Sequence, residues 1–177
     1  KKFFNNIKIE KHNVDEQLEK KNKRDLKPKE LAKHLAMKKA QSVSNIFNDK
    51  YIIGCDQILE CEGKLLNKPK DLDEAKENLL LLSGKKHKLF TCLYVLKKTK
   101  EFFVEETISH LYFKKITIQA IDKYINENIK TALSCVGSYK IEDNDKYNFL
   151  EIIEGNKEAI VGFPIKNLIR KFQSNKL

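Results

Sequence analysis

The sequence is poor in arginine although it is strongly basic. Only Arg24 and Arg170 are arginines, so lysine supplies nearly all of the positive charge behind a formal net charge of +10. Proteins that read base edges or clamp nucleic-acid phosphates usually use arginine for bidentate contacts. We therefore interpret the basic cluster at 20–24 as a solvated loop in preference to a nucleic-acid patch, while a positive field would help to collect polyphosphates.

Several other features are absent, and each absence narrows the class of protein. No stretch is apolar and long enough to cross a membrane, and no secretory signal pattern is visible, so we expect a cytoplasmic protein without a membrane partner. The four cysteines form no Cys-x-x-Cys pair and the four histidines are scattered, which leaves no zinc spacing. No linker rich in proline, glycine or serine divides the 177 residues, so one domain, 1–177, is expected.

Hydrophobic periodicity predicts intermixed helices and strands. Helical spacing covers 31–47 and 71–82, and shorter helices follow Thr117 and Pro164. Strands are predicted at 51–53, 87–97 and 101–113, with further strand-like stretches at 7–9, 151–154 and 159–161, and residues 1–6 read as the end of a helix. This mixture favours an α/β domain with a mixed sheet and flanking helices, in two lobes around a cleft.

Asp56 is the first catalytic candidate. It follows the apolar run 51–53 and Gly54, and we interpret it as a carboxylate delivered from the end of a buried strand, where ligands of open α/β sheets gather. Lys68 precedes Pro69, which fixes its backbone near the end of a predicted hairpin. An acid and a base at these positions suit phosphate chemistry. From the residues alone, a turn-capping Asp56 and a solvated Lys68 remain an open alternative.

Two further charged residues are candidates for the same site. Lys39 has Leu35, Ala36 and Val43 as its three- and four-residue neighbours, so it lies beside the apolar stripe of its helix. It either extends its stem over the edge of the core or has a functional role. Glu16 lies in the acidic pair Asp15-Glu16, and on the residues alone a surface carboxylate is the favoured interpretation, because acidic loop residues are common on any surface.

The order of the motifs along the chain resembles that of the Maf family of nucleotide pyrophosphatases. The matching segments run from about residue 14 to the last helix: Asp15-Glu16, Leu35-Ala36-x-x-Lys39-Ala40, Gly54-x-Asp56 with Lys68-Pro69, Ser83-Gly84-x-x-His87 leading to Thr91, Gly137-Ser138-Tyr139 and Val161-Gly162-Phe163-Pro164. The resemblance implies an elongated, cleft-bearing fold similar to those of Maf and ITPase proteins. It also implies a housecleaning enzyme that hydrolyses modified or non-canonical nucleoside triphosphates to monophosphate and pyrophosphate.

The resemblance further implies roles for individual residues and a metal cofactor. Asp56 would orient or deprotonate the attacking water, and Glu16, Lys39 and Lys68 would bind the phosphates. Mg²⁺ or Mn²⁺ would assist, with Glu16 and Asp56 as its carboxylate ligands. His87 is interpreted as a packing or capping residue, and Thr91 as a strand residue.

The branch of the family is indicated by Gln57 and Glu142. Members that take 7-methyl-GTP tend to have Asp-Gln and a later Glu at these positions, whereas members that take thymidine and uridine triphosphates tend to have Thr and Gln. A carboxylate accepts hydrogen bonds from N1–H and the exocyclic amine of guanine, and the charge of an N7-methylated ring strengthens them. We therefore expect 7-methyl-GTP as substrate, with Glu142 as a plain loop carboxylate the alternative.

One departure from the family pattern leaves rival functions open. The family begins with a strand and a Ser-x-Ser-x-x-Arg phosphate loop, for which this sequence has no match, and 1–4 resembles the helix just after that loop. Either the chain is a fragment of a longer polypeptide or the loop is missing. The rivals are a catalytically incomplete relative that binds nucleotide or a cell-division partner, and a basic RNA-binding module. A homodimer also stays open.

Overall fold

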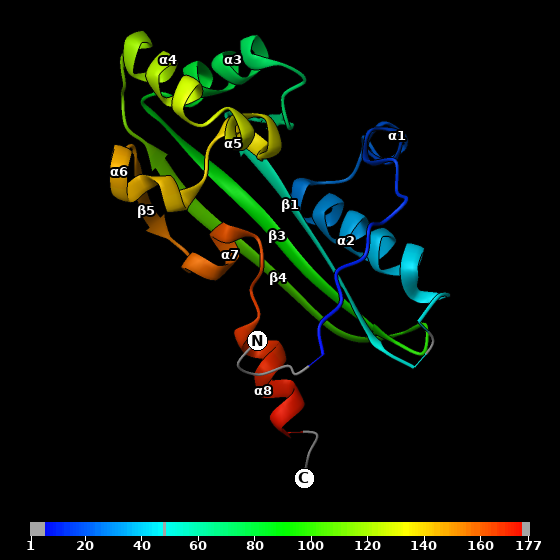
Figure 1. Cartoon of the computed structure of the whole chain (residues 1–177). Helices are drawn as coiled ribbons and strands as arrows, with labels where there is room; N and C mark the ends of the chain where they lie inside the picture. The colour runs from blue at the N-terminus through cyan, green and yellow to red at the C-terminus, as the bar shows by residue number, and fades with distance from the viewer. Residues whose placement is uncertain (1–5, 48, 175–177) are drawn as a thin grey trace.

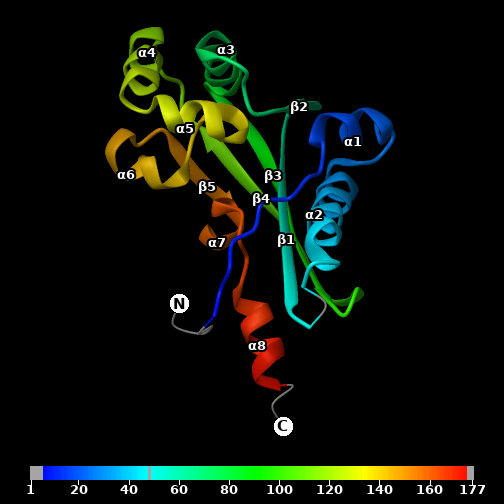
Figure 2. The same ribbon diagram turned by 45° about the vertical axis from the view of Figure 1, so that its right-hand side comes forward.

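A single sheet forms the centre of the computed structural model, which describes residues 6–47 and 49–174. In the described residues its strands lie in the order β2-β1-β3-β4-β5 (Figure 1, with β2 labelled in Figure 2). Their bounds are β1 (Tyr51–Cys61), β2 (Lys64–Leu66), β3 (Lys85–Lys97), β4 (Lys100–Phe113) and β5 (Leu150–Glu154). The helices around it are α1 (Glu16–Asn22), α2 (Pro28–Ser44), α3 (Leu72–Leu82), α4 (Ile118–Glu127), α5 (Ile129–Ser134), α6 (Asn144–Tyr147), α7 (Lys157–Val161) and α8 (Lys166–Ser174), with short 3-10 turns at Val136–Ser138 and Ile141–Asp143.

The predicted α/β class with flanking helices is confirmed, and the sheet is antiparallel where a mixed sheet was expected. Every pair of neighbouring strands among the described residues runs antiparallel. Tight turns join β1 to β2 and β3 to β4, and such short connections allow only antiparallel pairing. Helix α3 then returns the chain so that β3 enters beside β1 in the opposite direction.

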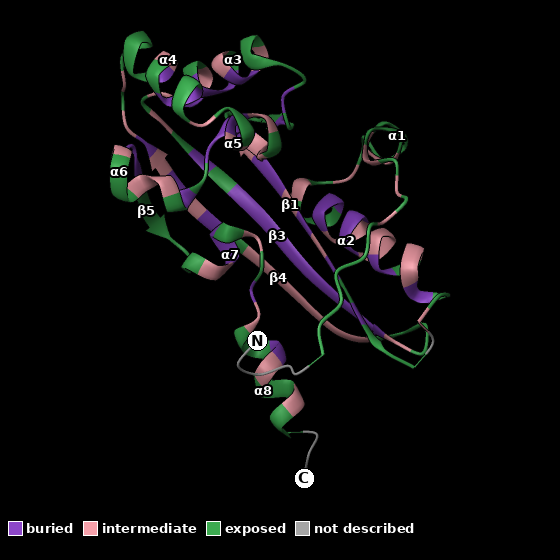
Figure 3. Cartoon of the chain, viewed as in Figure 1, coloured by how far each residue is buried: buried purple, intermediate pink, exposed green. Residues whose placement is uncertain are grey.

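The alternation of side chains along β1 and β3 divides the core between the two faces of the sheet. Even-numbered residues such as Ile58 and Cys92 face α2, and pack on its Leu35 and Ala36. Odd-numbered residues face the other side, where α3 to α7 cover one end of the sheet and α8 covers the other. Figure 2 shows α1 and α2 on one side of β1 and α5, α6 and α7 on the other, and Figure 3 shows the long buried stretch of β3 between them.

The predicted helices and the two long strands are confirmed, but three strand predictions are wrong. The strand predicted at 51–53 continues through Gly54 to Cys61, so Asp56 lies in the middle of β1 and not at its end. Residues 7–9 form no strand, and 159–161 belong to α7, which Asn156 caps. A short apolar run does not separate a buried strand from a buried helical turn, because either can bury it. The helix end expected at 1–6 lies outside the described residues, apart from Asn6.

None of the helices in the described part of the chain has the length and apolar character that crossing a bilayer requires.

Gly54 lets α2 approach β1 more closely than any other residue would. A Cβ atom at this position would lie 2.1 Å from the carbonyl oxygen of Ala36 and 2.8 Å from the amide nitrogen of Ala40. Both of these atoms belong to the backbone, so relief would require a shift of the whole helix. The contact brings the α2 residue that precedes Ala40, which is Lys39, over the strand position two residues beyond Gly54, which is Asp56.

The substitution Gly54→Ala tests this close approach. We expect the free energy of unfolding to fall by roughly 3 kcal/mol, because the added methyl group meets backbone atoms that cannot rotate away. Gly63→Ala is the matched control, since its Cβ atom would meet nothing within 4 Å and only its positive φ is unfavourable, at about 1 kcal/mol. Chemical denaturation measures both variants. A loss for Gly54→Ala no greater than that for Gly63→Ala would contradict the packing argument.

Candidate active site

A large pocket lies along β1 where the strand has an open edge. Strand β2 pairs only with Leu59–Cys61, so 51–57 has no partner on that edge among the described residues. The pocket has a volume of about 930 Å³ and is lined from both faces of the sheet, by Asp56 on the α2 side and by Gln57 and Gly162 on the α7 side. Its size lies within the range of ligand-binding clefts. The open edge therefore gives one ligand access to two differently built walls.

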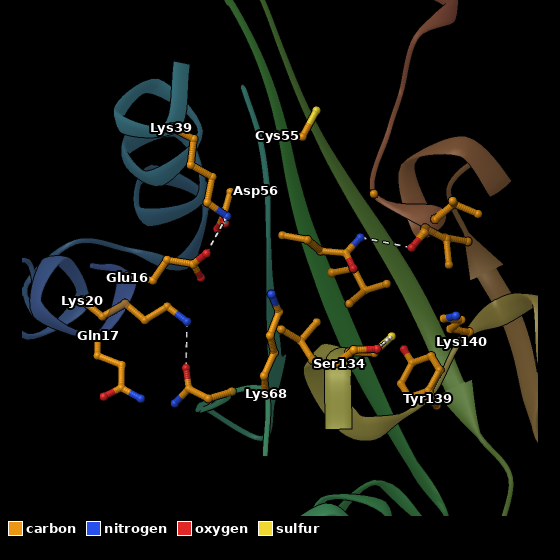
Figure 4. A pocket seen from close by; sticks show the side chains of 18 of the residues that line it. Glu16, Gln17, Lys20, Lys39, Cys55, Asp56, Lys68, Ser134, Tyr139 and Lys140 are labelled. Atoms are coloured by element: carbon orange, nitrogen blue, oxygen red, sulfur yellow. Dashed lines mark hydrogen bonds and ion pairs between the residues drawn. The ribbon is translucent and has the colours of Figure 1, made fainter. Parts of the chain in front are cut away.

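On the α2 wall, one lysine joins two carboxylates. The Lys39 ammonium lies 2.6 Å from Oδ1 of Asp56 and 2.8 Å from Oε1 of Glu16 (Figure 4). Glu16 is the first residue of α1, a helix that begins where Asp15 accepts a hydrogen bond from the amide of Leu18. Side-chain exposure is 13% for Lys39 and 6% for Asp56, so the pair is largely removed from water. The structure thus brings together three of the predicted site residues.

Burial and charge act in opposite directions on this cluster. Burial raises the pKa of Asp56 above its usual value, against the attraction of Lys39. Burial acts to lower the pKa of Lys39, but the two carboxylates prevail and raise it, so the ammonium stays charged. Burial acts to raise the pKa of Glu16, but the hydrogen bond and charge of Lys39, with Lys68 and Lys20, lower it. Asp56 is accordingly the more basic of the two carboxylates.

Oxygen Oδ2 of Asp56 is buried and has no hydrogen-bond partner among the described residues. A buried acceptor without a partner is rare in folded proteins, and calls for a ligand, an ion or a water. Because Oδ1 of the same carboxylate is engaged with Lys39, Oδ2 is a buried oxygen of this cluster that is free to act on a bound molecule.

Further lysines line the pocket near this cluster. Lys20 reaches from α1 to donate to Oδ1 of Asn67 at 2.7 Å, and burial lowers its pKa. Lys68 follows on the same segment, is exposed, and makes no ion pair among the described residues. Lys70 and Lys140 complete the basic lining. The interpretation of Lys20 as part of a solvated loop is wrong, because α1 directs it into the pocket. Its spacing of four residues from Glu16 on one helix was the available signal.

On the α7 wall, Gln57 acts as a clamp between elements. Its amide nitrogen lies 2.9 Å from Oγ1 of Thr91, 3.0 Å from the carbonyl oxygen of Ala159 and 3.1 Å from that of Ile160. Thr91 itself donates to the Ala159 carbonyl at 2.9 Å. Gln57 therefore lines the pocket while it ties α7 to β1 and β3. Sequence reasoning missed this linking role of Gln57 and Thr91, because the partner atoms are backbone carbonyls.

The loop that carries Glu142 closes the same side of the pocket. Glu142 is exposed on the pocket surface and forms no ion pair within the described part of the chain. Tyr139, which also lines the pocket, is buried and lies 2.6 Å through its hydroxyl from Nε2 of His87. The interpretation of His87 as a packing residue agrees with its burial in β3, where it anchors the loop through Tyr139.

A divalent metal ion fits the carboxylates of this site. The described residues contain no cluster of three or more potential metal ligands. Mg²⁺, however, is commonly held by one or two carboxylates together with substrate phosphates and water. Glu16 and Asp56 both form ion pairs with Nζ of Lys39, so their carboxylates lie close together. The unpaired Oδ2 of Asp56 offers an oxygen ligand. These two residues would hold the ion.

The fold and the site define an α/β protein with a large pocket on the open edge of its sheet, lined by several lysines and by a buried lysine–carboxylate cluster. A family model described as Maf-like protein matches residues 1–175, and the chain belongs to the Maf family. The 7-methyl-GTP pyrophosphatase of Bartonella henselae is 36% identical over 146 residues, which cover 82% of this chain and 73% of the relative. The dTTP/UTP pyrophosphatase of Bacillus cereus is 35% identical over 147 residues, which cover 82% of this chain and 74% of the relative.

The burial of His87 predicts a pH-dependent stability. Burial lowers the pKa of His87 to about 4, against an ordinary value of 6.5. Between these values the unfolded chain binds more protons than the folded protein, so stability falls as the pH drops from about 6.5 towards 4. The titration of His87 lowers the free energy of unfolding by up to ~1.4 kcal/mol for each pH unit in this range.

Urea denaturation of the wild type and of His87→Gln at pH 7 and pH 5 measures this contribution. Glutamine keeps a neutral hydrogen-bonding group for Tyr139 but does not titrate. We expect the difference in the free energy of unfolding between the two pH values to be smaller in the variant. An equal difference in both proteins would show that His87 takes no part.

Proposed function

We propose that this protein is a metal-dependent nucleoside triphosphate pyrophosphatase in which Asp56 acts on the attacking water. The observation that carries the proposal is the position of Lys39 between Glu16 and Asp56, with Oδ2 of Asp56 buried and unpaired. Membership of the Maf family supports the hydrolase class. So do the similar relatives, which are named pyrophosphatases and align with most of the chain. The rival of a basic RNA-binding module has no comparable support.

The basic residues of the pocket would bind the triphosphate. Phosphate oxygens compete with the carboxylates for Lys39, and Lys68, which has no ion pair among the described residues, can move to them without breaking one. Lys20 adds a further ammonium group. Burial lowers the pKa of Lys20, and an anionic ligand would stabilise its protonated form. These ammonium groups offset the negative charge of the polyphosphate chain.

Asp56 would handle the proton in the hydrolytic step. The water oxygen bonds to phosphorus while the anhydride bond between the α- and β-phosphates breaks, and the proton of the water passes to Asp56. The products are the monophosphate and pyrophosphate. The raised pKa of Asp56 suits this role, because a more basic carboxylate accepts a proton more readily. Mg²⁺ or Mn²⁺, when bound, neutralises charge on the phosphates and the leaving pyrophosphate.

Asp56→Asn tests the assigned base. The amide keeps the shape of the side chain but loses its charge and basicity, so we expect pyrophosphate release to fall by at least about a hundredfold. Asp122→Asn is the matched control, since Asp122 pairs with Lys76 on the surface and does not line the pocket. Circular dichroism establishes that both variants are folded. Near-normal turnover of Asp56→Asn would reject the assignment.

Lys39→Met and Lys68→Met test the assigned phosphate contacts. Methionine keeps most of the aliphatic stem without the charge. We expect kcat/KM to fall for each variant, by an amount that corresponds to roughly 2–4 kcal/mol of lost transition-state stabilisation. Lys38→Met, on the same helix but outside the pocket lining, should retain the wild-type value. Steady-state kinetics with the three variants decides. Unchanged kcat/KM for both Lys39→Met and Lys68→Met would return these residues to a solvated role.

We further propose 7-methyl-GTP as the preferred substrate. Gln57 and Glu142 both line the pocket, and Glu142 is an exposed carboxylate that no basic side chain of the described residues neutralises. It can accept from N1–H and the exocyclic amine of guanine, whereas thymine and uracil offer one ring N–H on that edge. The similar relatives include both substrate types at nearly equal identity, so the proposal rests on these two residues.

A panel of triphosphates with Mg²⁺ or Mn²⁺ tests the substrate. We expect 7-methyl-GTP to be hydrolysed faster than dTTP or UTP, and Glu142→Gln to lower only the former rate, by about tenfold or more for one charge-assisted hydrogen bond. Asp145→Asn is the control in the adjacent helix α6, as Asp145 is exposed and does not line the pocket. Faster hydrolysis of dTTP or UTP by the wild type would overturn the choice.

A further inference from the structure

A buried asparagine behind the pocket connects two of its walls. Asn78 lies on α3 with 8% exposure, and its side chain does not line the pocket. Its amide nitrogen lies 3.2 Å from Oγ of Ser138 and 3.4 Å from the carbonyl oxygen of Asn67. One NH₂ group thus serves two segments that are distant in sequence, and a buried amide that satisfies both is costly to replace by an apolar group.

At one end of this link the backbone is in an unfavourable conformation. Ser138 has a φ of +64° and no exposed surface, and it follows Gly137 with a φ of +71°. A residue with a Cβ atom loses about 1–2 kcal/mol in the left-handed region, so such a conformation persists only where its surroundings impose it. Among the described residues, Asn78 is the side chain that bonds to Ser138.

The turn at Ser138 directs the chain towards the pocket. The next residues, Tyr139 and Lys140, line the pocket, as does Glu142. Tyr139 then meets His87 of β3, which supplies the second anchor of this loop. A change in the dihedral angles at Ser138 would therefore displace Tyr139, Lys140 and Glu142. The last of these is the residue proposed to contact the nucleobase.

The other end of the link belongs to the phosphate side of the pocket. Asn67 precedes Lys68, and its own side chain accepts the hydrogen bond from Lys20 of α1. By holding the Asn67 carbonyl, Asn78 fixes the segment from which Lys68 extends. Asn78 is consequently the junction between the lysines that would bind the polyphosphate and the loop that would bind the base.

We propose that Asn78 is a positioning residue that sets the register between the base-binding loop at 137–142 and the Lys68 segment. This inference rests on the proposed pyrophosphatase function and adds to it a determinant of selectivity outside the pocket lining. Its action is indirect, because the Asn78 side chain does not line the pocket and would not contact a bound ligand. Loss of the link lets the loop leave the left-handed turn, so that base recognition and phosphate alignment no longer coincide.

Asn78→Leu removes the amide at similar volume, and Ser138→Gly provides the test of mechanism. We expect Asn78→Leu to lower kcat/KM for the best triphosphate by tenfold or more, and to reduce its preference over the next best. Glycine adopts positive φ without penalty, so the Asn78→Leu loss should be smaller in a Ser138→Gly background. Leu79→Val, its neighbour in the core of α3, is the control for stability alone and should leave the preference unchanged.

Hydrogen exchange of the amides at 135–142 gives a readout that does not depend on activity. We expect faster exchange in Asn78→Leu than in Leu79→Val in the protein without nucleotide. Asn78→Asp keeps the shape of the side chain but places a carboxylate oxygen against the Asn67 carbonyl oxygen. It should also speed exchange, and it replaces Asn78→Leu if that variant does not fold.

The two proposals fail in different ways. If the wild type releases no pyrophosphate from any triphosphate, the proposed function is wrong, and exchange at 135–142 still decides the role of Asn78. If the wild type is active while Asn78→Leu and Asn78→Asp keep its preference and its exchange rates, the positioning role is overturned. An Asn78→Leu loss that is equal in the wild-type and Ser138→Gly backgrounds would likewise overturn it.

Discussion

The ion pairs that join Lys39 to Asp56 and Glu16 are the interaction on which the site depends. They exist because Gly54 admits the backbone of α2 to within contact of β1, so the lysine of the helix lies over the carboxylate of the strand. Removing Asp56 and Lys39 from water, with Glu16 half-buried beside them, is unfavourable unless each charge is compensated. Lys39 compensates both carboxylates incompletely, since Oδ2 of Asp56 has no partner among the described residues. The cluster therefore has a net negative charge and an open acceptor, a state that a metal ion and a polyphosphate can complete together.

The open edge of β1 explains how one strand can serve two walls with different chemistry. Successive residues of a strand point to opposite faces, so Asp56 faces the lysines and carboxylates of the α2 side while Gln57 faces the carbonyl groups of α7. A partner strand along the whole length of β1 would separate the two faces. Because β2 stops at Leu66, a ligand can pass around the edge and contact both. Under the proposed function, the residue that acts on the water and a residue of the base-recognition wall are thus neighbours on one strand.

The sequence was sufficient for the class of fold and for the charged centre, and insufficient for the parts that depend on backbone contacts. The helices around Lys39 and Asn78 follow from apolar spacing and capping residues, and the motifs around Asp56 placed three contacting residues in one site. The position of Asp56 within its strand was misjudged, because a glycine after an apolar run marks a strand end as readily as a close approach by a helix. The roles of Gln57, Asn78 and Ser138 depend on distant carbonyl groups and on a positive φ, which no local pattern reveals.

The central claim is that Lys39 and Asp56 work as one unit, and a double-mutant cycle on pyrophosphate release tests it most directly. The measured quantity is kcat/KM for the wild type, Lys39→Met, Asp56→Asn and the double variant. Residues that act as a unit have strongly non-additive effects. The account predicts that the double variant loses little more than the more impaired single variant, because removal of either member disables the same centre. Losses that multiply would show two independent residues and contradict the account.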